Sequence, residues 1–133
     1  MTKREAKAIG LTEAHIQQTV TEFLQFDGWR AIRTDPVSDR ERGKGFGEKG
    51  MPDHLYVRYN LLGAYQRAEV LWIEFKRPGE KPRPHQLDWH EAERKRGALV
   101  LVVDDIDQFI SWYKTSILRL STSRGCLNHK LTL

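Results

Sequence analysis

Three residues whose side chains could act together in hydrolysis stand at two places in the chain. Asp53 directly follows Pro52, and Glu74 and Lys76 are separated only by Phe75. Successive side chains of a strand point to opposite faces, so a strand would project Glu74 and Lys76 on one side and Phe75 on the other. Taken alone, this Glu-Phe-Lys pattern is equally typical of a surface ion pair, which contributes only about 0 to 1 kcal/mol.

The position of Asp53 favours a chemical interpretation. If the strands predicted over 55–59 and 70–75 pair antiparallel, the start of the first lies beside the end of the second, and Asp53 lies next to Glu74 and Lys76. Neighbouring carboxylates repel unless a cation joins them, and Mg²⁺ prefers oxygen ligands. A bound metal would stabilise developing charge and lower the pKa of its water. Lys76 could then orient or deprotonate that water, or neutralise a phosphate oxygen.

The elements that must position these residues follow from hydrophobic periodicity and turn residues. In chain order they are a helix over 12–27, strands over 29–34, 55–59 and 70–75, a helix over about 85–96, a strand over 98–103 and a helix that begins near 106. Asn60 to Ala68 is predicted to connect two of the strands in a hairpin-like way. Residues 35–50 are rich in glycine and charge, which predicts a loop that either closes over a nucleic-acid backbone or is a plain surface loop. This order predicts an α/β domain with helices flanking one central sheet.

Length and composition set the class of protein. The 133 residues suit a single domain, 1–133, with a core over about 11–118 and a basic polar tail over 119–133. Hydrophobic residues make up 39% and charged residues 30%, and the sequence shows neither a membrane span nor a secretory signal. With one cysteine, Cys126, no internal disulfide is expected, so we expect a cytoplasmic protein.

The charge balance and its distribution are compatible with a nucleic-acid partner. The net charge is +4 and the sequence pI is about 9.3. The basic residues that we expect to contact DNA are Arg33, Arg40, Arg42, Lys44, Lys49, Arg77, Lys81 and Arg83. For any one of these clusters a solvated surface is an equally good interpretation.

Three ordered segments resemble a known family. They are Gly50-Met51-Pro52-Asp53-His54-Leu55, Ile73-Glu74-Phe75-Lys76-Arg77-Pro78-Gly79 and Pro84-His85-Gln86-Leu87-Asp88-Trp89. The first two carry the Pro-Asp and Glu-x-Lys pattern of the PD-(D/E)XK nucleases. All three together resemble the VRR-NUC branch, the virus-type replication–repair nucleases, over roughly residues 11 to 107.

The resemblance implies a restriction-endonuclease-like core with a central mixed sheet, and a Mg²⁺ cofactor that Mn²⁺ can replace. It implies metal ligands at Asp53, Glu74 and the carbonyl of Phe75, a catalytic role for Lys76, and an assisting role for Gln86. Standalone phage or bacterial members are expected to act as homodimers on branched DNA, at a Holliday junction or a flap. The implied function is a DNA endonuclease with a place in DNA repair.

The family also implies one more acid on the first helix. Glu13 lies three and seven residues before Ile16 and Val20 and so shares the inward stripe, whereas Glu22 lies about 200° round the helix from Val20. Periodicity therefore favours Glu13 as a catalytic residue and metal ligand, and Gln17, one turn on, could also reach the site. The alternative for Glu13 is an acid in the first turn that the helix dipole stabilises.

Several alternatives stay open at this stage. A restriction-type endonuclease would need an element that reads base edges, and no helix-turn-helix or zinc finger is visible. A non-catalytic DNA-binding module on the same fold would bind without cleaving, and an RNA nuclease is also compatible with the sequence. His85 and His90 are five residues apart, off a common helical face, so no zinc site is expected.

Overall fold

The first helix follows the predicted apolar stripe. The computed structural model describes residues 2, 10–34, 47–62 and 65–117 of the chain. Helix α2, Glu13–Phe26, starts after Thr12, whose side chain accepts a hydrogen bond of 3.1 Å from the backbone nitrogen of His15. Its buried residues are Ile16, Val20 and Leu24. The helix ends at Asp27, and Gly28 follows with φ of 88°, a conformation that glycine adopts without a Cβ clash. The helix predicted over 12–27 is confirmed.

A four-stranded mixed sheet forms the centre of the fold. Its strands are β1 (Arg30–Arg33), β2 (His54–Leu62), β3 (Tyr65–Phe75) and β4 (Leu99–Val103), in the spatial order β1-β2-β3-β4. The pairs β1–β2 and β2–β3 are antiparallel, whereas β3 and β4 are parallel. A parallel pair needs a long crossover, and helix α3, Pro84–Lys95, supplies it.

The bounds of β2 and β3 correct one prediction. The two strands pair as far as Leu62 opposite Tyr65, so most of the connection predicted over 60–68 is strand. Asn60 and Ala68, at the two ends of the predicted connection, have low β-propensity. The backbone hydrogen bonds between β2 and β3 hold these residues in the strands in spite of that propensity.

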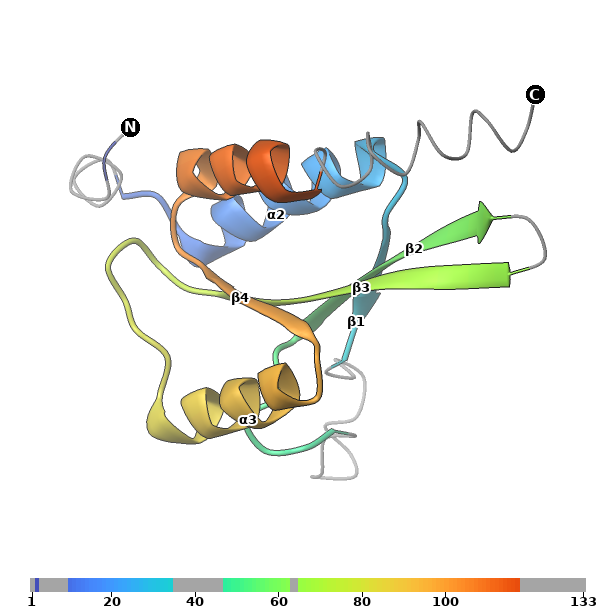
Figure 1. Cartoon of the computed structure of the whole chain (residues 1–133). Helices are drawn as coiled ribbons and strands as arrows, with labels where there is room; N and C mark the ends of the chain where they lie inside the picture. The colour runs from blue at the N-terminus through green and yellow to red at the C-terminus, as the bar shows by residue number, and fades with distance from the viewer. Residues whose placement is uncertain (1, 3–9, 35–46, 63–64, 118–133) are drawn as a thin grey trace, which may run out of the picture.

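The helices cover both faces of the sheet (Figure 1). Helix α2 and a helix over 106–117 lie on one face, and α3 lies on the other. The later helix is capped by Asp105, whose Oδ1 accepts a hydrogen bond of 2.9 Å from the backbone nitrogen of Gln108. Gly97, with φ of 103°, follows the end of α3.

The main core lies between the sheet and the two helices on its first face. Ile16, Val20 and Leu24 of α2 pack with Phe109, Tyr113 and Ile117 against strand residues, and these strand residues are Tyr56, Leu71, Ile73, Phe75 and Val103. The predicted α/β fold with a central mixed sheet is confirmed, and it is consistent with a restriction-endonuclease-like core. Within the described part of the chain no helix is long and apolar enough to cross a membrane. The basic tail predicted over 119–133 lies outside the described residues.

Candidate active site

The sheet register sets Asp53 opposite Glu74. His54 pairs with Ile73, so one further step along the same antiparallel register places Asp53 across from Glu74. The backbone nitrogen of Thr34 donates a hydrogen bond of 3.0 Å to the carbonyl oxygen of Asp53, which extends the β1–β2 ladder to this residue. Side chains of directly opposite residues lie on the same face of a sheet, with Cβ atoms about 4.5–5.5 Å apart. The pairing therefore brings the two acids to the same end of β2 and β3, whereas their role as metal ligands stays a prediction.

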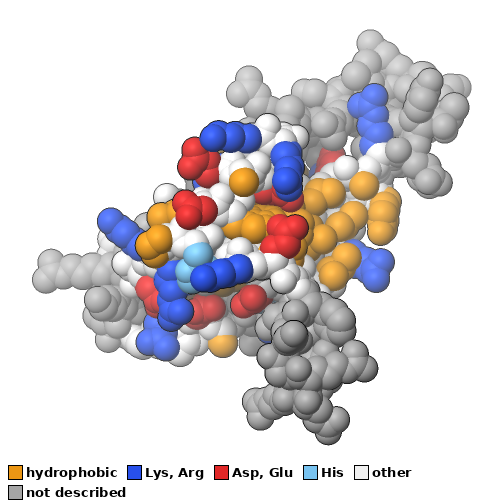
Figure 2. All heavy atoms as spheres, turned by 90° about the horizontal axis from the view of Figure 1, so that it is seen from below, with side chains coloured by type: hydrophobic (Ala, Val, Ile, Leu, Met, Phe, Trp, Pro, Cys, Tyr) orange, Lys and Arg blue, Asp and Glu red, His pale blue; other side chains and the backbone are white. Residues whose placement is uncertain are grey.

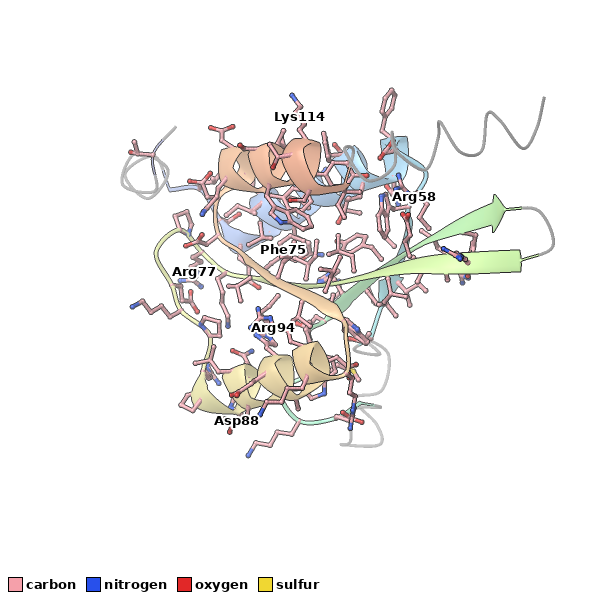
Figure 3. The ribbon with its side chains drawn as sticks, viewed as in Figure 1. Arg58, Phe75, Arg77, Asp88, Arg94 and Lys114 are labelled. Atoms are coloured by element: carbon pink, nitrogen blue, oxygen red, sulfur yellow. The ribbon has the colours of Figure 1, made fainter. Side chains whose placement is uncertain are left out.

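The Glu-Phe-Lys segment ends β3 in buried surroundings. Phe75 is part of the core and lies between the sheet and the helices α2 and 106–117 (Figure 3). Glu74 is on the other side, where α3 covers the sheet, and it is 5% exposed. Lys76 is 7% exposed, and its backbone nitrogen donates a hydrogen bond of 3.0 Å to Val103, so β4 fixes its position. Two buried, oppositely charged side chains at a strand end are unlike an exposed surface ion pair.

Glu13 belongs to the same electrostatic cluster. Burial raises the pKa of its carboxyl group above 4.5, the positive charge of Lys76 opposes this rise, and the negative charges of Glu80, Glu74 and Asp53 add to it. A charge can influence another in this way only when the two are near each other. The start of α2 therefore brings Glu13 to the site formed by β2 and β3.

The second acid of α2 points elsewhere. Glu22 is exposed, and its Oε1 accepts a hydrogen bond of 3.3 Å from Nε2 of Gln18. The orientation that periodicity predicted for Glu13 and Glu22 is thus confirmed, whereas the catalytic role of Glu13 stays a prediction.

A groove opens beside Glu13. It has a volume of about 610 Å³, and its lining includes Thr12, Glu13, Gln17, Arg77 and Pro78. Gln17, which lies one turn after Glu13, shares the groove with it, whereas its reach to the acids of the sheet stays a prediction. Arg77 extends from the segment that follows β3 (Figure 3) and brings a positive charge to the groove. The groove can receive an anionic group next to the acidic cluster.

Gln86 has a structural contact at the start of α3. Its Oε1 accepts a hydrogen bond of 2.8 Å from the backbone nitrogen of Arg83, the residue that precedes the helix. This is the role that the residue would have without any family resemblance. Its assisting role in the active site stays a prediction.

His90 is a residue of the site that sequence reasoning missed. It is fully buried, and its Nε2 lies 3.4 Å from Oε1 of Glu74. From the sequence alone, His90 was considered only together with His85, as a possible zinc pair. Its position relative to Gln86 is the clearer indication of a role in the site. His90 follows Gln86 by four residues and therefore shares its face of α3.

The acidic side chains do not form a ready metal cage as they stand. Among the described residues, no three His, Cys, Asp or Glu side chains are grouped closely enough to hold an ion. However, Oε1 of Glu74 is buried and has no hydrogen-bond partner. A buried carboxylate oxygen in this state is destabilising unless a cation or donor satisfies it.

The candidate DNA-binding residues are only partly described. Five of the eight predicted residues have exposed side chains, namely Arg33, Lys49, Arg77, Lys81 and Arg83. The other three, Arg40, Arg42 and Lys44, lie outside the described residues. On the face formed by α3, basic and acidic side chains are interspersed (Figure 2). Hydrophobic side chains gather beside this helix, where β2 and β3 continue past it and Tyr59 and Val70 are 65% and 39% exposed. This face therefore has mixed charge rather than a uniform positive surface.

Part of the chain is similar to a known phage protein. No protein-family model matches the chain. Over 61 residues, or 46% of the chain, it is 36% identical to "Putative nuclease p44" of Acyrthosiphon pisum secondary endosymbiont phage 1. The match covers 58% of that protein, so the chain spans little more than half of the length of the relative it matches. The similarity supports a nuclease in general.

Proposed function

We propose that this chain is a metal-dependent nuclease of the PD-(D/E)XK type that hydrolyses phosphodiester bonds in DNA. The observation that carries the proposal is the pairing of β2 with β3, which brings Asp53, the residue before β2, to the end of β3 that carries Glu74 and Lys76. The similarity to a phage nuclease supports the same reaction class.

The donor set fits a hard divalent cation. Asp53, Glu74 and Glu13 are oxygen donors of the kind that Mg²⁺ prefers. Burial raises the pKa of Glu13, and the negative charges of Glu80, Glu74 and Asp53 add to this rise, so a cation at this place would offset the repulsion between the acids. Asp53, Glu74 and the carbonyl of Phe75 would hold Mg²⁺, or Mn²⁺ in its place, and Glu13 would complete the set. Such an ion supplies Lewis acidity at the phosphate and acidifies its bound water.

The chain's own residues then bind and orient the phosphate. The ammonium group of Lys76 lies in buried surroundings, where a charge interacts more strongly than in water. We assign its Nζ the task of donating hydrogen bonds to a phosphate oxygen and stabilising the negative charge that builds up there. Arg77 is placed in the groove to hold a neighbouring phosphate of the same strand.

We further propose that the substrate is branched DNA and that the active form is a homodimer. The resemblance to the VRR-NUC nucleases supports both points. A two-fold dimer presents two sites, which suits the paired strands of a four-way junction. Because the sequence shows no helix-turn-helix or zinc finger, we propose that the enzyme recognises DNA shape rather than base edges.

Cleavage of labelled DNA tests the proposal. Linear duplex, single strand, 5′ flap and four-way junction are each incubated with Mg²⁺, Mn²⁺ or a chelator. Matched reactions contain wild type, Glu74→Gln, Lys76→Met and the control Glu22→Gln, whose side chain faces solvent on α2. We expect metal-dependent cutting by wild type and the control, and a loss of at least 100-fold in the other two variants.

The substrate panel separates the remaining alternatives. Preferential cutting of the flap or junction over a duplex of the same sequence supports structure selectivity. Cutting of one particular duplex sequence instead supports a restriction-type enzyme. Binding without cleavage of any substrate, under either metal, contradicts the nuclease and supports a binding module.

A further inference from the structure

Helix α3 buries a single residue, and that residue is a histidine. Over its whole length, Pro84–Lys95, the buried position is His90, which has no exposed surface. A helix that packs on a sheet normally presents a stripe of apolar residues. The apolar stripe of α3 is weak because its central contact with the sheet is made by an imidazole ring.

This imidazole is not explained by packing alone. Neither Nδ1 nor Nε2 of His90 has a hydrogen-bond partner among the described residues. An unsatisfied buried polar group is destabilising, so a leucine would suit a purely structural position better. The ring contact with Trp89, at 6.4 Å between centroids, is one that many side chains could replace. The histidine is therefore expected to have a functional role that a leucine side chain could not fill.

The position of Glu74 next to the ring indicates this role. Nε2 of His90 lies 3.4 Å from Oε1 of Glu74, and this same carboxylate oxygen is buried without a hydrogen-bond partner. The neutral imidazole can carry its proton on Nε2 and then donates it to an acceptor. One donor and one acceptor, both buried and both unpaired, thus face each other at slightly more than hydrogen-bond distance.

We infer that His90 is a positioning residue for Glu74, which it orients from α3 by donating from Nε2 to Oε1. The inference rests on the proposed function, in which Glu74 is a metal ligand. Carboxylates that bind metals are commonly held by a further hydrogen bond, and the loss of such a partner costs about 10- to 100-fold in metal affinity or activity. Held through Oε1, Glu74 offers its second oxygen to the cation.

A direct ligand role for His90 is less well supported. Its Nε2 already faces Oε1 of Glu74 at 3.4 Å. In addition, Mg²⁺ favours oxygen over imidazole nitrogen. The imidazole is thus better placed to hold Glu74 than to replace it.

Three substitutions of His90 in the full chain test the role. His90→Leu keeps apolar volume and removes the donor, and His90→Gln carries an amide donor at a position similar to Nε2. His90→Asn carries its donor nearer to the position of Nδ1. The control is His85→Leu on the same helix, about 140° round from His90. The measurements are Mn²⁺ affinity by titration calorimetry without DNA, and the urea midpoint of each variant.

We expect His90→Leu to weaken Mn²⁺ binding by about 10- to 100-fold while its urea midpoint stays at or above that of wild type. His90→Gln should restore most of the affinity, His90→Asn should not, and His85→Leu should bind as wild type does. This pattern distinguishes a donor at one place from mere filling of the core.

Two results would overturn the inference, and they differ in what else they overturn. If wild type binds Mn²⁺ and cleaves DNA but His90→Leu binds Mn²⁺ equally well, the positioning role is wrong and the nuclease stands. If wild type neither binds Mn²⁺ nor cleaves any DNA, the proposed function fails and the inference fails with it. Equal rescue by His90→Gln and His90→Asn also contradicts donation from Nε2.

Discussion

The indole nitrogen Nε1 of Trp89 donates a hydrogen bond of 2.7 Å to Oε2 of Glu48, which connects α3 to the segment leading into Asp53. On its other side the Trp89 ring meets Trp72 edge-on, with 5.0 Å between the centroids. Trp72 precedes Glu74 by two residues on β3 and points to the same face. One side chain of α3 thus links the two segments that carry the candidate acids.

We predict that Trp89→Phe weakens this link while it keeps the ring contact with Trp72. The lost hydrogen bond should lower the free energy of unfolding by about 1 kcal/mol. Cleavage should fall further than stability does, because a small misplacement of catalytic groups is costly. A double-mutant cycle with Glu48→Ala, measured by urea unfolding, checks the first point. Strictly additive effects of the two substitutions would mean that the bond contributes nothing.

Gly50 lies where α3 and the segment before Asp53 approach most closely. Its φ is 90°, and a Cβ added there would lie 2.2 Å from the carbonyl oxygen of His85. Gly79 has a similar φ of 84°, but a Cβ there would meet no atom within 4 Å. The two glycines therefore separate backbone strain from a steric clash.

Replacement of both glycines by alanine tests this difference. Gly79→Ala should cost about 1 kcal/mol, the strain of an L-residue at positive φ. Gly50→Ala should cost that amount and about 1–3 kcal/mol more, because α3 must shift away from the strand end. Urea unfolding gives both values. Equal costs at the two positions would show that α3 moves freely, and the tight packing at Gly50 would then be unimportant.

The features that could be predicted from the sequence are those that depend on local residue patterns. Period-3.6 hydrophobic residues placed α2 and set Glu13 on its inner face, and alternation placed Glu74 opposite Phe75. Antiparallel pairing then followed from the connection between β2 and β3 and brought Asp53 to Glu74. These relations depend on residues that are close in sequence or directly paired.

Other features depend on contacts that no local pattern encodes. His90 is buried because α3 packs across Glu74, and a polar residue in a polar helix gave no sign of this burial. The far ends of β2 and β3 extend beyond the predicted strands because backbone pairing overrides the weak propensity of Asn60 and Ala68. The capping role of Gln86 depends on its hydrogen bond with the backbone nitrogen of Arg83, which the sequence pattern does not specify.

Two buried tyrosines predict a loss of stability at high pH. Burial raises the pKa of Tyr113 to about 12, and its hydrogen bond to Asp27 adds to the rise. Burial likewise raises the pKa of Tyr56 to about 12, against the opposing effect of its hydrogen bond with Thr21. Both groups hold their protons more tightly in the folded state, so the stability they contribute is complete below pH 10 and is lost as the pH rises towards 12.

Urea midpoints measured between pH 8 and pH 11.5 check this expectation. Wild type should lose stability steadily above about pH 10. Tyr113→Phe should be less stable at pH 8, since it lacks the bonds to Asp27 and Trp29, but its decline above pH 10 should be about half as steep. An unchanged slope in this variant would contradict the assignment of the transition to Tyr113.

Glu13 should oppose folding while it serves the reaction. Its pKa is raised chiefly by burial, and Glu80, Glu74 and Asp53 add to the rise. A raised pKa means that the ionised carboxylate is less favourable in the folded state than in the unfolded one. The stability contributed by the protonated form is present below the ordinary value of 4.5 and is lost as the pH rises through the folded-state pKa, so at pH 7 the charge on Glu13 is unfavourable.

Replacement of this acid by its neutral isostere should therefore separate stability from activity. At pH 7 and with a chelator present, Glu13→Gln should unfold at a higher urea concentration than wild type, because the uncompensated charge is gone. With Mg²⁺ present, the same variant should cleave DNA at least 10-fold more slowly. The matched control, Glu22→Gln, lies on the same helix and faces solvent, so it should change neither quantity. A Glu13→Gln variant that is less stable than wild type and cleaves at the normal rate would place Glu13 outside the site and leave it the role of a first-turn acid stabilised by the helix dipole.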